Sequence, residues 1–114
     1  MSTPPTPAPN DSIAQLVDIL GEEDARDLVQ TFFKEYDELF RKLVSGARED
    51  QHLAAHGLKS SSRHMGLASL AQRFSVLEDR LAKPDGTVDS DDIAIISVEY
   101  ERAVPPLRKY IQGK

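Results

Sequence analysis

The chain has 114 residues, 29% of them charged and 39% hydrophobic, a composition that fits one small globular domain and leaves no room for a second. Because cysteine is absent, disulfides, thiolate nucleophiles and cysteine-ligated metals are excluded. The formal net charge of -5 argues against a general nucleic-acid binder. No apolar stretch approaches the roughly 20 residues that span a bilayer, and no secretion signal opens the chain, so we expect a cytoplasmic protein without membrane contacts.

The N-terminal segment, residues 1–10, contains Pro4, Pro5, Pro7 and Pro9 with few apolar side chains between them. Such a segment cannot bury enough apolar surface to offset the entropy lost on ordering. We therefore expect a flexible proline-rich tail over residues 1–10 and a single helical domain over residues 11–114.

A short first helix is predicted from Asp11 or Ser12 to Leu20, because apolar residues recur there at intervals of three and four. Ser12 is the expected N-cap, and Gly21 lies just beyond the end. The next segment begins with the acidic turn 22–24 and carries a long apolar stripe from Ala25 to Val44. This second helix should end at Ser45-Gly46.

Three further segments complete the pattern. A third helix is expected from about Glu49 to Met65, and a fourth from Leu67 to Leu81, followed by a turn over residues 83–86. A fifth begins near Ser90, and Pro105-Pro106 should kink or break it. No strand-like alternation occurs. The predicted fold is all-α, an antiparallel four-helix bundle with an additional short N-terminal helix.

The predicted third helix has two unlike sides when its residues are advanced by about 100° each. Opposite His56 lies a narrow stripe that should face the core, consisting of Ala54, Leu58, Ser61 and Met65. Around His56 lies a polar sector that should face solvent, consisting of His52, Lys59, Ser60 and Arg63. Glu49 is the acid that aligns with this sector. In an acidic chain, the sector is therefore locally basic.

These neighbours suit a reactive imidazole. Repulsion from Lys59 and Arg63 should leave His56 neutral, with a nitrogen lone pair available as a nucleophile. A phosphoryl group on that nitrogen would then be stabilised by the same cations. Because Ala55, Gly57 and Ser60 are short, we expect that a partner protein can bring its own phosphoryl acceptor close to the ring.

The run Ala55 to Ser62, followed by Gly66, Leu67 and Leu70, resembles the histidine-containing phosphotransfer (HPt) family. The resemblance implies a helical bundle in which His56 is phosphorylated and Lys59 steadies the phosphoryl group; Arg63 is added from the helical face. It also implies partners, namely receiver domains of response regulators or hybrid histidine kinases in a multistep two-component phosphorelay. Members generally lack kinase activity and need no cofactor, since the receiver domain supplies the magnesium. Ser60 stands where the family usually has glycine.

Two other interpretations fit parts of the same sequence. His52 and His56 have the spacing of a two-histidine metal site, but a third ligand is missing and the neighbouring cations would repel the metal, so we predict no metal. The alternative function is a helical adaptor or inhibitor that binds a receiver or kinase domain without being phosphorylated. The predicted site thus comprises His56, Lys59 and Arg63, which act in phosphotransfer, and His52, Gly57 and Ser60, which face the partner protein. We expect the protein itself to be a monomer.

Overall fold

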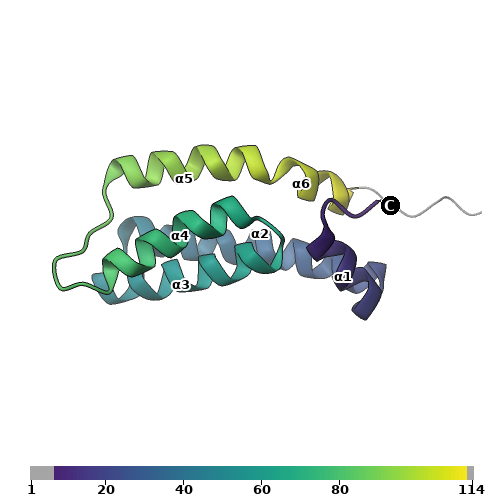
Figure 1. The fold of residues 1–114 in the computed structure, drawn as a ribbon, viewed down its shortest axis with the longest axis horizontal. Helices are drawn as coiled ribbons and strands as arrows, with labels where there is room; N and C mark the ends of the chain where they lie inside the picture. Colours follow the sequence, from purple (N-terminus) through teal and green to yellow (C-terminus); the bar gives the residue numbers. More distant parts are fainter. Residues whose placement is uncertain (1–6, 113–114) are drawn as a thin grey trace, which may run out of the picture.

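The computed structural model describes residues 7–112, which form an elongated bundle of helices (Figure 1). The helices are α1 (Asp11–Leu20), α2 (Glu22–Ser45), α3 (Arg48–His64), α4 (Ala68–Leu81), α5 (Ser90–Ala103) and α6 (Pro105–Gln112). No strand occurs in this range. The all-α prediction is confirmed, and α2 to α5 are the long helices of the bundle. The proline pair divides the predicted fifth helix into α5 and α6, because Pro105 cannot continue the α5 hydrogen bonding.

One hydrophobic core runs the length of the bundle and includes residues from all six helices. Phe32 and Tyr36 of α2 are buried, as are Leu58 of α3 and Phe74 of α4. Figure 1 shows α3 and α4 lying side by side as a hairpin, with α5 along the other side of α4. The apolar periodicity of each segment thus creates one continuous buried surface.

The start of α1 differs from the prediction. Asn10, not Ser12, is the N-cap: its side-chain oxygen accepts a hydrogen bond from the Ile13 backbone N–H at 2.9 Å. The Asn10 amide also donates to the Met65 carbonyl at 2.8 Å, so one side chain joins α1 to the end of α3. The prediction of Ser12 was wrong because the helix already begins at Asp11, so its N-cap stands two residues before Ser12.

The turn between α3 and α4 depends on Gly66. Its φ of +77° lies in the left-handed region, which is common for a glycine just beyond the end of a helix. A Cβ at this position would approach the Asn10 side chain to 2.6 Å. The same glycine therefore permits both the tight turn and the seating of α1 against it.

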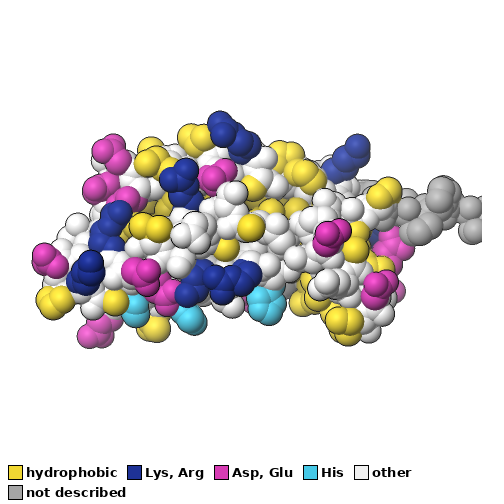
Figure 2. All heavy atoms as spheres, in the orientation of Figure 1, with side chains coloured by type: hydrophobic (Ala, Val, Ile, Leu, Met, Phe, Trp, Pro, Cys, Tyr) yellow, Lys and Arg dark blue, Asp and Glu magenta, His cyan; other side chains and the backbone are white. Residues whose placement is uncertain are grey.

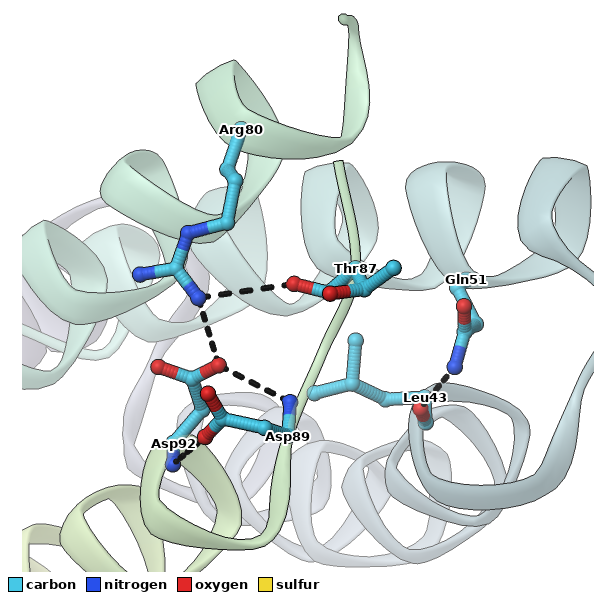
Figure 3. A network of polar contacts seen from close by, with 6 residues as sticks. All are labelled: Leu43, Gln51, Arg80, Thr87, Asp89 and Asp92. Atoms are coloured by element: carbon cyan, nitrogen blue, oxygen red, sulfur yellow. Dashed lines mark hydrogen bonds and ion pairs between the residues drawn. The ribbon is translucent and has the colours of Figure 1, made fainter. Parts of the chain in front are cut away.

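A polar network holds the start of α5 against the end of α4 (Figure 3). Arg80 pairs with Asp92 at 2.5 Å, and Asp92 and Asp89 form a reciprocal capping box at the start of α5. Arg80 also donates to the Thr87 carbonyl in the connecting loop. This loop is thereby anchored at the end of the bundle.

A flexible tail was predicted over residues 1–10. Residues 1–6 of this segment lie outside the part of the chain that the structure describes. Of the rest, Ala8 packs against the core and Asn10 caps α1. Within residues 7–112, every helix is too short or too polar to cross a membrane.

Candidate functional site

The candidate site lies on the outer face of α3. Figure 2 shows the histidine side chains in a row along one edge of the molecule, with basic side chains close by. The His56 side chain is 61% exposed, as its position on the helical wheel predicts. Its ring is therefore accessible to a partner.

The opposite face of α3 is buried, but the buried arc is displaced from the predicted one. Ala54, Leu58 and Met65 are in the core as expected. Ser61 was assigned to the core wrongly: it is half-buried. Ala55, expected beside the accessible face, and Ser62 are instead fully buried. The close packing of α4 against α3 explains this displacement, since α4 is the helix that α3 contacts most extensively.

Glu78 of α4 reaches across to the site. Its Oε2 lies 2.6 Å from Nδ1 of His56, and its Oε1 forms an ion pair with the ammonium group of Lys59. An ionised carboxylate only accepts hydrogen bonds, so Nδ1 is the donor and the hydrogen of the neutral ring resides there. In that neutral tautomer, Nε2 carries the free lone pair. The residues of α3 alone do not predict this contact.

The pKa of the Glu78 carboxyl is lowered, chiefly by its hydrogen bond with Lys59 and further by the one with His56, against the opposing effect of burial. Glu78 is thus held in the ionised form that accepts both bonds. Its side chain is only 16% exposed, which limits competition from water for the carboxylate.

This arrangement corrects the predicted electrostatics. On the helical wheel, Glu49 is the acid that aligns with the sector, but the acid that contacts the ring is Glu78. Lys59 was expected to face solvent, yet its side chain is only 20% exposed and its charge is paired. Lys59 lies at the border between the exposed face and α4, where a long side chain can turn toward a neighbouring helix.

A groove of about 440 Å³ runs beside the His56 ring, between α3 and the pair α1 and α2. Gly57 and Ser60 line it, as does His64, for which no role was predicted. Its other walls are mainly apolar and are formed by Leu16, Leu28, Thr31, Phe32, Glu35, Leu39, Ser61 and Met65. The groove gives the exposed ring an adjoining apolar surface.

The remaining predicted residues lie apart from this groove. His52 is half-buried and lines a separate hollow with Leu53 and Leu81. Arg63 is exposed near the end of α3. Across residues 7–112, the histidines and carboxylates form no group of three or more that could hold a metal ion.

A signal for Glu78 does exist in the sequence. Glu78 follows the buried Leu77 and stands four residues after the buried Phe74, so it lies at the border of the apolar face of α4. A carboxylate at that border is well placed to reach the neighbouring helix. Which helix it would meet, and at which residue, depends on how α3 and α4 are aligned.

Comparison with known proteins agrees with this fold. The family model described as Hpt domain matches residues 27–107, a stretch that contains α3, α4, α5 and most of α2. No curated protein and no solved structure matches the chain. Since the matched residues make up more than half of the sequence, the chain belongs to the Hpt-domain family, whose members are phosphocarrier modules in the histidine phosphotransfer of two-component systems.

Proposed function

We propose that the protein is a cytoplasmic, monomeric phosphocarrier in a multistep phosphorelay. Nε2 of His56 attacks the phosphorus of an aspartyl phosphate on one receiver domain, the N–P bond forms, and the aspartate leaves with the electrons of the broken O–P bond. The reverse sequence delivers the phosphoryl group to the aspartate of another receiver domain. The receiver provides the magnesium ion, and the protein itself contributes no cofactor.

The observation that carries this proposal is the state of the His56 ring. The ring is 61% exposed, and its Nδ1 is engaged by Glu78, so the nitrogen that remains free is Nε2. A neutral imidazole with one nitrogen held by a carboxylate is an oriented nucleophile. The short side chains of Gly57 and Ser60 leave room beside it.

The surroundings supply the other requirements of transfer. Lys59 can use the remaining donors of its ammonium group for the phosphoryl oxygens while it stays near Glu78. Arg63 offers a second, exposed cation on the same helix. The apolar groove beside the ring provides a surface for a receiver domain, because transient partners commonly bury a small apolar centre inside a polar rim.

The proposal is tested with a panel of phosphorylated receiver domains as phosphoryl donors. Each member of the panel is incubated with the protein, and acid-labile, alkali-stable phosphate on the protein is measured. We expect the wild type to accept label and His56→Gln to accept none. His52→Gln and His64→Gln, which alter the other histidines of α3, should retain it.

Binding of the same receivers separates transfer from the adaptor alternative. If His56→Gln still binds but carries no label, the phosphocarrier function is supported. If the folded wild type binds a receiver but never acquires label, or if His56→Gln acquires as much as the wild type, the proposal is wrong. The first of these results would favour an adaptor or inhibitor.

A further inference from the structure

The outer side of α5 carries two large apolar side chains that the core does not need. Ile95 is 47% exposed and Val98 is 57% exposed. They stand three residues apart, so they lie together on one side of the helix. Ile96, which follows Ile95, is fully buried and holds α5 to the bundle by another side. The burial of α5 in its own bundle therefore does not account for Ile95 and Val98.

Opposite charges continue this apolar pair at both ends. Asp91 stands four residues before Ile95, in the first turn of α5. Arg102 stands four residues after Val98, in the last turn. Both are exposed, and within residues 7–112 neither takes part in an ion pair. The helix dipole favours an acid and a base at these two ends, but it gives no reason for the exposed apolar pair between them.

The four residues form a stripe that is complementary to itself. Their spacing of four, three and four is the spacing of the seam between two packed helices. When a second copy lies antiparallel to the first, Ile95 stands opposite Val98 of that copy, and Asp91 stands opposite its Arg102. Two-fold symmetry repeats each contact, so the stripe makes two apolar contacts flanked by two ion pairs.

From this pattern we propose that two copies of the chain associate through α5, with the two helices antiparallel and Ile95 and Val98 at the centre. The occupant of the exposed face is thus a second copy of the same chain. The proposal goes beyond the phosphocarrier function and does not depend on phosphoryl transfer at His56.

The charges beside the stripe are compatible with this arrangement. Acids of α5 that approach the second copy would repel it if they were unpaired. Each of the three flanking acids is paired with an arginine of its own chain: Asp92 with Arg80, Glu99 with Arg73 and Glu101 with Arg108. The charges that remain without a partner in the stripe are then the complementary ones at its ends.

The association should be weak, because the apolar centre is small. Stable interfaces generally bury roughly 1,200–2,000 Å², more than one helix face with two apolar side chains from each copy provides. We expect dimers at protein concentrations of about 1 mM, where even weak interfaces are occupied. In dilute solution the monomer proposed as the phosphocarrier prevails.

The proposed interface lies away from the candidate site. Figure 1 shows α4 between α3 and α5, and Figure 2 shows hydrophobic side chains over α5 along one edge of the molecule and histidines along the opposite edge. His56 of both copies therefore stays exposed in the dimer. A partner that carries two receiver domains could then engage both copies at once, which raises its apparent affinity.

Sedimentation equilibrium of the purified full-length chain measures the association over a concentration series up to about 1 mM. We expect the average mass to rise from 12.7 kDa toward twice that value. His56→Gln should associate as the wild type does, since its ring lies on another face. A mass that stays at 12.7 kDa throughout would overturn the proposal, even if a different protein is found to bind this face.

The apolar centre is tested by Val98→Ser. The dissociation constant of the dimer should rise about tenfold or more, because the symmetry removes two buried valine side chains at once. Val44→Ser is the matched control, since Val44 lies on α2 with a similar exposed fraction of 51%. Circular dichroism verifies that both variants are folded. An unchanged dissociation constant in folded Val98→Ser would place any association on another face and overturn the proposal.

Charge reversal tests the antiparallel arrangement. Asp91→Arg sets two positive charges opposite each other, and Arg102→Asp sets two negative charges opposite each other, so neither variant alone should associate. An equimolar mixture of the two should form mixed dimers, because every arginine then faces an aspartate of the other variant. Association of either variant alone as tight as that of the wild type, or a mixture that stays monomeric, would contradict the proposed pairing.

Discussion

A single carboxylate contacts the ring of His56, the side chain that we propose carries the phosphoryl group. The cations of the α3 sequence led us to expect a ring surrounded by positive charge, whereas the group in contact with it is negative. This difference matters for the proposed chemistry, because the two charges act on different nitrogens of the ring. A cation stabilises a phosphoryl group on Nε2, whereas an anion accepts the hydrogen bond from Nδ1.

Glu78 also makes folding stability depend on pH. Its pKa is lowered from the ordinary 4.5 in the folded protein, so its pairing stabilises the fold above pH 4.5 and is lost as the pH falls through the lower folded value. At pH 7 we expect Glu78→Gln to be less stable than the wild type by under about 1 kcal/mol.

Urea unfolding at a series of pH values provides the measurement. The difference in unfolding free energy between wild type and Glu78→Gln should shrink below pH 4.5. Asp79→Asn serves as the control and should show no such change. A difference that grows toward low pH would contradict the assignment.

At the scale of the helices, the attachment of α1 depends on Asn10. Its side chain caps α1 and also binds the Met65 carbonyl at the end of α3. Because Leu16 of α1 lines the groove beside His56, this capping residue also fixes one wall of the candidate partner surface.

We predict that Asn10→Ala lowers the unfolding free energy by about 1 kcal/mol, the usual effect of losing an N-cap. Amide hydrogen exchange in α1 should accelerate, because the contact with the α3–α4 turn is lost as well. Ser12→Ala is the matched control, since Ser12 lies inside the helix and does not cap it. Equal losses for the two variants would show that the cap is assigned to the wrong residue.

At the scale of the whole molecule, an aromatic cluster in the core contributes to stability. Tyr36 stacks on Tyr100 with ring centroids 4.0 Å apart and meets Phe74 edge-on at 6.0 Å, which joins α2, α4 and α5. Burial raises the pKa of the Tyr36 phenol, and among the described residues its hydroxyl has no hydrogen-bond partner. An unpaired buried hydroxyl reduces stability.

Tyr36→Phe should therefore leave the unfolding free energy unchanged or raise it by up to about 1 kcal/mol, since the stacking is kept and the unpaired hydroxyl is removed. Phe74→Ala should lower it by about 3–5 kcal/mol, the typical effect of emptying a buried aromatic site. Both are measured by urea unfolding. A loss above 1 kcal/mol in Tyr36→Phe would show that the hydroxyl does bind a partner.

The helices and the exposed face of α3 were predictable because both depend on local periodicity. Apolar spacing identified every helix to within about a residue, and the proline pair indicated the break before α6. The position of His56 on the wheel identified it as exposed for the same reason. The prediction for Ser12 failed because the helix start, and with it the N-cap, lies two residues earlier than expected. The prediction for Ser61 failed because the packing of α3 against its neighbours displaces the buried arc.

The amino-acid sequence by itself determined the fold class, the resemblance to the phosphotransfer family and the side of α3 on which His56 lies, since each follows from residue types at short spacing. Only the tertiary structure decided that Glu78 contacts both His56 and Lys59, and that α1 and α2 form the groove beside the ring. These contacts join residues far apart in the chain. Their existence depends on the alignment of packed helices, which short-range periodicity does not specify.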